Sequence, residues 1–112
     1  MKRTMEFNNY QHRCQATAMY PADRALEYLG LGLVSEAGEV AGKIKKLIRD
    51  HNSELTPELA DQISFELGDV LWYIAQLCTE LKTNMGKVAI DNIQKLSHRK
   101  LSNTIKGEGD NR

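Results

Sequence analysis

Apolar residues recur at intervals of three and four along nearly the whole chain, which is the spacing of one face of an α-helix. The chain shows no sustained alternation of apolar and polar residues, and it lacks the dense turn residues that separate short strands. We therefore predict an all-α fold with four helices and no sheet. The expected helices cover residues 6–19, 22–49, 57–81 and 87–101.

Local signals place the ends of these helices. The first is expected to end before Pro21, because a residue that precedes proline disfavours the helical backbone conformation. After a loop at residues 51–55, Thr56 is typical of an N-cap and Pro57 of a first helical position. Residues 83–86 break the chain before the last helix.

Length and charge bound the organisation and the partners. A chain of 112 residues is one small domain whose core is adequate but not generous, so a partner chain is expected. We assign residues 1–102 to a single helical domain and residues 103–112 to a polar C-terminal tail. Lys+Arg and Asp+Glu number 15 each, and this balance indicates neither a nucleic acid nor a membrane as a partner.

The cysteines and the apolar runs predict where the protein resides. Cys14 and Cys78 are isolated in sequence, which is typical of a reducing cytosol. The longest apolar run, residues 70–75, is far shorter than the ~20 residues that span a bilayer. No hydrophobic signal region follows Met1, so a soluble cytoplasmic protein is expected.

Two acidic pairs with the same spacing lie inside apolar runs. They are Glu36 with Glu39, and Glu66 with Asp69. Residues three apart share a helix face, so each pair can grip a cation from one side. Two consecutive helices joined by a short loop pack antiparallel, which would bring the four carboxylates together. Unneutralised, these carboxylates would repel the helices or become protonated, and a bound cation would prevent both.

The ligand types select the cation. All four candidate ligands offer oxygen, which favours Mg²⁺ or Mn²⁺ over zinc. The Glu-x-x-His motif of di-iron bundles is absent, because no glutamate stands three residues before His12, His51 or His98. Mg²⁺ held by carboxylates usually keeps waters and completes its shell with substrate phosphates, and a metal-bound water is an available nucleophile. The site therefore indicates hydrolysis of a phosphate ester or phosphoanhydride.

At this point the motifs resemble those of a known family. Residues 32–40 (GLVSEAGEV) and 66–73 (ELGDVLWY) are similar to the all-α nucleoside triphosphate pyrophosphohydrolases of the MazG type. Residues 92–99 (NIQKLSHR) and 107–112 (GEGDNR) resemble the small single-domain members, including those found in phages. The similarity covers nearly the whole chain. It implies a four-helix MazG-like bundle completed by dimerisation, as a homodimer or homotetramer.

The resemblance also implies a reaction. It is the Mg²⁺-dependent hydrolysis of a nucleoside or deoxynucleoside triphosphate between the α and β phosphates, for nucleotide pool control or housecleaning. By motif match, Glu36, Glu39, Glu66 and Asp69 would be the catalytic metal ligands, and the metal would activate the attacking water. Many members carry a further glutamate directly before the first pair, where this chain has Ser35. The identity of any separate general base is therefore open.

Several substrate contacts follow from the resemblance and the helical wheel. Asn92 and Lys95 match a family position that contacts phosphate or sugar, and Tyr73 matches a nucleoside-facing aromatic. Core packing is the alternative for Tyr73, and an exposed surface position is the alternative for Lys95. The wheel places Lys43 beside the first acidic pair, where it would contact phosphates or form a salt bridge with Glu39. The full expected set is Lys43, Tyr73, Asn92, Lys95, Gln11 and Arg112.

Two other functions are compatible with the same residues. One is a phosphoribosyl-ATP pyrophosphohydrolase, which cleaves the same kind of bond in another substrate. The other is a non-catalytic helical interaction protein whose carboxylates bind a structural metal or a basic partner. Base and sugar preference depend on pocket shape, which residue spacing does not encode.

Overall fold

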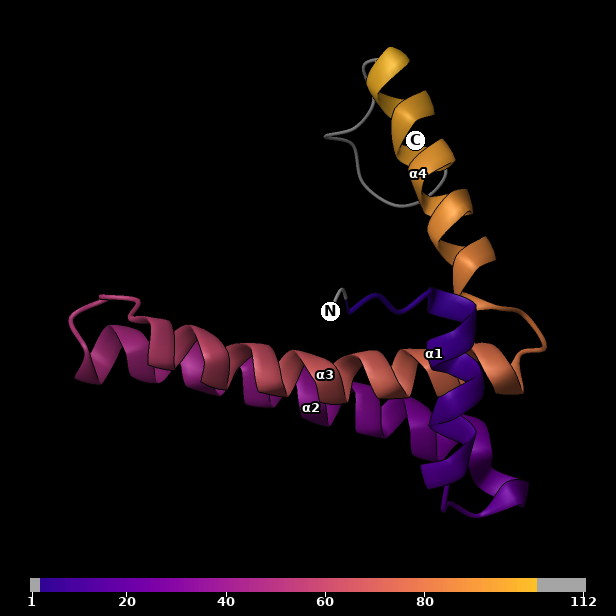
Figure 1. The fold of residues 1–112 in the computed structure, drawn as a ribbon, viewed down its shortest axis with the longest axis horizontal. Helices are drawn as coiled ribbons and strands as arrows, with labels where there is room; N and C mark the ends of the chain where they lie inside the picture. Colours follow the sequence, from indigo (N-terminus) through magenta and orange to yellow (C-terminus); the bar gives the residue numbers. More distant parts are fainter. Residues whose placement is uncertain (1–2, 103–112) are drawn as a thin grey trace.

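Four α-helices build the part of the chain that the computed structural model describes, residues 3–102 (Figure 1). They are α1 (Phe7–Cys14), α2 (Ala25–Asp50), α3 (Pro57–Glu80) and α4 (Met85–Leu101). Within this range there is no strand, which confirms the all-α prediction with four helices. The predicted tail, residues 103–112 with Arg112, lies outside the described residues.

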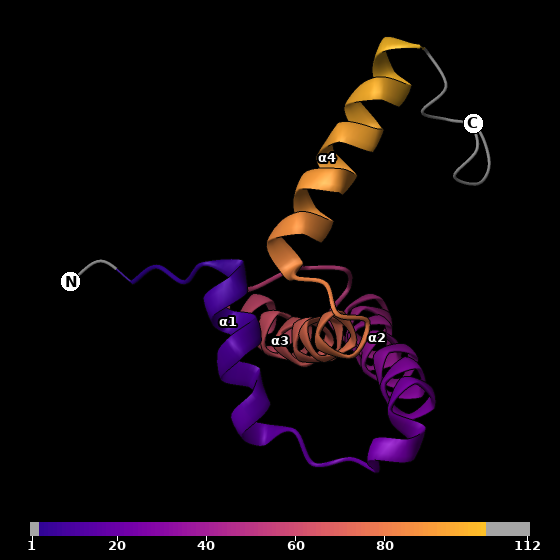
Figure 2. The same cartoon turned by 90° about the vertical axis from the view of Figure 1, so that its right-hand side faces the viewer.

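The body of the molecule is a long antiparallel hairpin of α2 and α3 (Figures 1 and 2). Each helix has a row of buried or half-buried residues at the three-and-four spacing of helices packed along their length. In α2 this row is Leu29, Leu33, Glu36, Val40, Lys43 and Leu47; in α3 it is Leu59, Ile63, Glu66, Val70, Tyr73 and Leu77. The rows therefore carry charged residues in the middle of an otherwise apolar seam.

Helix caps explain where α3 and α4 begin. The Thr56 side chain accepts a hydrogen bond from the backbone N–H of Leu59 at 3.2 Å, and proline stands at the first position of α3, as predicted. The Asn84 side chain accepts from the backbone N–H of Lys87 at 2.8 Å. Because asparagine caps the helix there, α4 begins at Met85, inside the segment that was predicted to be a break.

The first predicted helix, residues 6–19, is too long. The α-helix ends at Cys14, and residues Gln15–Thr17 continue as a 3₁₀ turn. The Thr17 hydroxyl donates to the Cys14 carbonyl at 3.1 Å, so a threonine side chain satisfies a carbonyl at the helix end. A second 3₁₀ turn, Ala22–Arg24, leads into α2.

α1 crosses the hairpin at its open end and joins it to α4 (Figures 1 and 2). Gln11 is buried and connects these parts: its amide donates to Thr79 Oγ1 at 3.1 Å and to the Thr83 carbonyl at 3.0 Å. It also accepts from the backbone N–H of Met85 at 2.8 Å. The small core nearby consists of Cys14, Ala75, Cys78 and Met85.

Much apolar surface is left uncovered in the single chain. Beyond this junction α4 projects away from the hairpin (Figure 1), and Ile90 and Ile93 are exposed on it. Only Ala25 and Leu29 are buried among the residues of α2. None of the described helices is both long enough and apolar enough to cross a membrane.

Candidate metal centre

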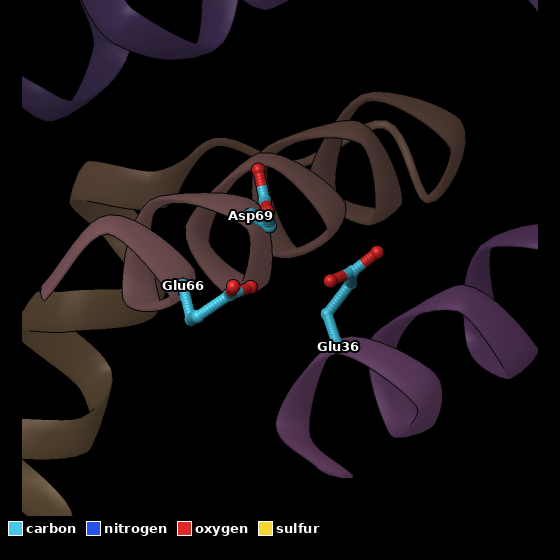
Figure 3. Close-up of side chains that lie close together, drawn as sticks. All are labelled: Glu36, Glu66 and Asp69. Carbon is cyan, nitrogen blue, oxygen red and sulfur yellow. The ribbon is translucent and has the colours of Figure 1, made fainter. Parts of the chain in front are cut away.

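Three of the four predicted acidic residues converge at the middle of the hairpin. Glu36 points from α2 toward Glu66 and Asp69 on α3 (Figure 3). One carboxylate oxygen from each of the three lies within 4.8 Å of the others. Glu36 and Glu66 are half-buried and Asp69 is exposed. The antiparallel hairpin thus creates a three-carboxylate centre from residues about thirty positions apart.

Glu39 is exposed and is not one of these three converging residues. It lies one turn after Glu36 on α2, close enough for its charge to act on the Glu36 carboxyl. The structure therefore places three of the predicted ligands together and the fourth at the margin.

The centre is electrostatically unfavourable without a cation. Burial is the main factor that raises the pKa of Glu36, and the negative charges of Asp69, Glu66 and Glu39 raise it further. Lys43 supplies a partial countercharge, since its Nζ is 3.8 Å from Glu66 Oε1. The salt bridge of Lys43 is thus with Glu66, on the facing helix, rather than with the predicted Glu39.

A hard divalent cation suits this donor set. The three converging side chains offer only carboxylate oxygens, which Mg²⁺ and Mn²⁺ prefer and structural zinc sites seldom use alone. Glu66 and Asp69 are held by a single rigid helix, and Glu36 closes the site from the other side. Three carboxylates would leave room in an octahedral shell for waters and for the oxygens of a phosphate.

The raised pKa of Glu36 predicts a pH dependence of stability. Because this pKa lies above the ordinary value of 4.5 only in the folded state, that state retains a proton which the unfolded state loses. We expect the free energy of unfolding of the metal-free protein to fall as pH rises from 4.5 through the raised pKa. Urea unfolding in EDTA, at a series of pH values, measures how the free energy of unfolding changes with pH. The Glu36→Gln variant should lack this component, and a wild-type profile parallel to that of the variant would contradict the prediction.

An aromatic pocket adjoins the carboxylates. A cavity of about 400 Å³ is lined by Glu36 and Asp69 together with Tyr28, Trp72 and Tyr73. Thr17 and Met19 complete its lining. The order of residues on the hairpin thus sets three aromatic side chains directly beside two of the three converging carboxylates.

Three contacts fix the rings of Trp72 and Tyr73. Trp72 Nε1 donates to Thr17 Oγ1 at 2.8 Å, so the 3₁₀ turn after α1 orients the indole. The Tyr73 ring lies against Gly32: a Cβ at position 32 would be 2.1 Å from Tyr73 Cε1. The rings of Trp72 and Tyr73 meet edge to face, with centroids 5.0 Å apart.

The motif comparison did not identify Tyr28, Trp72 or Thr17 as site residues. Tyr28 stands two helical turns before Glu36, a position that a longer helical wheel would have included. The Gly32–Tyr73 contact also had a sequence signal, because glycine in the middle of a helix costs stability and usually has a packing reason. The partnership of Thr17 with Trp72 spans 55 residues and has no such signal.

Among the described residues, the predicted substrate contacts Gln11, Asn92 and Lys95 are not at the centre. Gln11 is buried, and its amide is used in the hydrogen bonds that connect α1 to the start of α4. Asn92 and Lys95 are exposed on α4, which projects away from the hairpin. Arg112 lies outside the described residues. Substrate contacts by these four residues stay predictions.

Comparison with known proteins gives one family and one clear relative. Residues 24–102 match the model of the MazG nucleotide pyrophosphohydrolase domain. The chain is 42% identical over 114 residues to the Gene 37 protein of Mycobacterium phage L5, in an alignment that covers 96% of this chain and 100% of the phage protein. That name states no activity. No solved structure matches the chain.

Proposed function

The chain belongs to the MazG nucleotide pyrophosphohydrolase family, and from this premise we propose that it hydrolyses nucleoside or deoxynucleoside triphosphates to the monophosphate and pyrophosphate. The observation that carries the proposal is the convergence of Glu36, Glu66 and Asp69, with carboxylate oxygens within 4.8 Å. These residues would hold Mg²⁺, or Mn²⁺ in its place. The cation would polarise phosphate oxygens and lower the pKa of a coordinated water.

One further residue completes the proposed metal site, and another completes the proposed binding of phosphate. Glu39 neighbours Glu36 on the same helix and serves as the fourth carboxylate, either directly or through a water. Lys43 exchanges its ion pair with Glu66 for a substrate phosphate once a cation neutralises the glutamate. The 3.8 Å separation from Glu66 supports this exchange, because a partly exposed ion pair of this length is weak.

The aromatic pocket is the proposed nucleoside site. Tyr28, Trp72 and Tyr73 offer ring faces and edges on which a base can pack, directly beside the carboxylates that would hold the phosphates. Base–aromatic stacking typically contributes about 1–3 kcal/mol per base. Control of a nucleotide pool, or removal of damaged nucleotides, is the biological role that such a site serves.

Adding a methyl group at Gly32 tests the nucleoside pocket. In Gly32→Ala the new Cβ would lie 2.1 Å from Cε1 of Tyr73, so the tyrosine ring must leave its position. We expect KM for the nucleotide to rise by about tenfold, which corresponds to the loss of about 1.4 kcal/mol of binding. Steady-state kinetics of pyrophosphate release measures this change.

Gly42→Ala is the matched control. Gly42 is on the same helix, and a Cβ there has no neighbouring atom within 4 Å. This variant should keep the wild-type KM and gain about 0.5–1 kcal/mol of stability from the better helix former. Equal KM values for the two variants would argue against a role for the Tyr73 ring position.

A substrate panel separates the proposed function from its closest alternative. Canonical and modified nucleoside triphosphates are compared with phosphoribosyl-ATP by kcat/KM in the presence of Mg²⁺. We expect at least one nucleoside triphosphate to be the better substrate. A clear preference for phosphoribosyl-ATP would contradict the proposal and would identify the protein as a phosphoribosyl-ATP pyrophosphohydrolase.

The non-catalytic alternative gives a different thermal signature. A metal-binding interaction protein would melt at a higher temperature with Mg²⁺ but would show no further increase with a nucleotide. For the proposed enzyme, a non-hydrolysable triphosphate added with Mg²⁺ should raise the melting temperature above that of the metal complex. Differential scanning fluorimetry distinguishes the two.

We also propose that the active form is a homodimer, or a homotetramer built from such dimers. A second row of α2 residues repeats at three-and-four spacing and is exposed throughout: Val34, Ala37, Ala41, Ile44 and Ile48. Val34 is 71% exposed and Ile48 is 62% exposed. A second copy packed against this row would bury it as in a coiled coil, with the two alanines allowing close approach.

A dimer would also account for the predicted residues of α4. Asn92 and Lys95 lie on a helix that leaves its own hairpin (Figure 2), and the same helix carries the exposed Ile90 and Ile93. Packing of α4 on a partner chain would cover these isoleucines. It would also bring Asn92 and Lys95 toward the phosphates of a substrate bound at the partner chain's carboxylate centre. A cytosolic location belongs to the same proposal, because Cys14 and Cys78 are free thiols.

A further inference from the structure

A small cleft with cationic side chains lies at the loop end of the hairpin. It encloses about 90 Å³ between the last turns of α2 and the first turns of α3. Lys43, Lys46 and His51 line it from α2 and the loop, and Gln62 lines it from α3. Three potential cations and one amide donor are groups that bind phosphate oxygens.

The cleft shares two lining residues with a cavity that reaches the carboxylate centre. Lys43 and Gln62 also line a second cavity, of about 270 Å³, whose other lining residues are Asp61, Phe65 and Glu66. Glu66 is in turn one of the three converging carboxylates. A bound molecule can therefore extend from the centre, past Lys43, to Lys46 and His51.

Helix geometry directs the lysines toward the centre. Lys43 and Lys46 follow Glu36 by seven and ten residues, which are about 10 and 15 Å along a helix axis. Long helical side chains lean toward the N-terminus of their helix, and in α2 that direction leads back to Glu36. For Lys43 this direction agrees with the position of its Nζ, 3.8 Å from Glu66 Oε1.

One acid also lines this cleft, and it is already paired. Both oxygens of Asp50 accept hydrogen bonds from Arg49 at 2.8 Å, one from Nε and one from Nη2. The hydrogen bonds from Arg49 are the main reason why the pKa of Asp50 is lowered. His51 and Lys46 lower this pKa further through their charges, so both groups act on Asp50 as well as lining the cleft.

The order of environments along the hairpin matches the order of groups in a nucleotide. Aromatic rings lie at the α1 end, carboxylates in the middle, and cations at the loop end. We propose that this cleft binds the β and γ phosphates of the substrate and then the pyrophosphate product, with Lys46 and His51 as binding residues. This inference deepens the proposed function and rests on it. It fixes the direction of the substrate, with the base toward α1 and the polyphosphate toward the loop.

Binding of pyrophosphate itself is the test. Isothermal titration of the Mg²⁺-loaded protein with pyrophosphate compares wild type, Lys46→Gln, His51→Gln and the control Lys45→Gln. Lys45 neighbours Lys46, is exposed and does not line the cleft, so its substitution removes the same charge from another face. We expect Lys46→Gln and His51→Gln to weaken pyrophosphate binding by about tenfold and Lys45→Gln to change it by less than about twofold.

Kinetics adds a second readout. The Lys46→Gln variant should have a kcat/KM for a triphosphate about tenfold below that of the wild type. Its affinity for the matching nucleoside monophosphate should change much less. Lys46→Gln and Lys45→Gln with the same pyrophosphate affinity would overturn the inference even if the wild type is active. Pyrophosphate binding that depends on Lys46, in a protein without hydrolytic activity, would support the anion site and refute the proposed function instead.

Discussion

Asp69→Asn is expected to reduce the rate of pyrophosphate release by about 10²–10³-fold, the size of effect seen when one charge-stabilising group is removed from an active site. Asparagine keeps the shape of the side chain but removes the charge that would hold the cation. Asp69 offers an oxygen within 4.8 Å of oxygens from Glu36 and Glu66, so its loss leaves two carboxylates at the centre. Initial rates over a range of Mg²⁺ concentrations separate weaker metal binding from slower turnover.

The same substitution should stabilise the metal-free protein. Asp69 is the foremost of the negative neighbours that raise the pKa of Glu36, after burial itself. Removing that charge relieves repulsion in the folded state, so the free energy of unfolding in EDTA should increase. Lower activity together with higher metal-free stability is the signature of a functional charge cluster, and a residue needed only for folding would lower both.

Glu58→Gln is the control for this pair of effects. Glu58 is an exposed acid in the first turn of the same helix, outside the carboxylate centre. Its substitution should leave turnover unchanged and cost about 0.3–1 kcal/mol of stability, because the favourable interaction with the helix dipole is lost. If Asp69→Asn behaved like Glu58→Gln, the carboxylate centre would not be the catalytic centre.

Ile44→Glu is expected to separate the proposed dimer into single chains. Ile44 lies in the middle of the exposed α2 row and is 43% exposed in the single chain. An unpaired carboxylate buried at that seam would cost several kcal/mol, so dimer affinity should fall by at least about 100-fold. Light scattering should give the wild type at least twice the 12.7 kDa of one chain, and the variant a mass near 12.7 kDa.

Leu55→Glu provides the comparison for that experiment. Leu55 is also an exposed apolar residue, but it lies in the hairpin loop, away from the α2 row. The same substitution there should leave the mass unchanged. A wild-type protein that is monomeric at micromolar concentration would contradict the dimer and the proposed placement of α4 on a partner chain.

Local sequence signals were sufficient for the number of helices and for the convergence of three of the acids. Helical periodicity defines faces within a helix, and a short loop between two long helices forces them to pack side by side. Glu36, Glu66 and Asp69 could therefore be brought together from spacing alone. The cap at Thr56 was likewise predictable, because its hydrogen bond joins residues three apart.

Longer-range contacts could not be obtained in this way. The position of α4 depends on two hydrogen bonds of Gln11, which donates to the Thr83 carbonyl and accepts from the Met85 N–H, both more than seventy residues away. Lys43 pairs with Glu66 on the facing helix rather than with Glu39 on its own helix. Helical wheels describe one helix at a time and contain neither kind of information.

The most direct test of the central claim is an assay of reaction products. The purified protein is incubated with a preferred nucleoside triphosphate and Mg²⁺, and the products are quantified by chromatography before and after addition of EDTA. The account predicts equal amounts of nucleoside monophosphate and pyrophosphate, with turnover that stops in EDTA and resumes when excess Mg²⁺ is restored. Release of nucleoside diphosphate and phosphate, turnover that EDTA does not affect, or no turnover across the whole panel would contradict it.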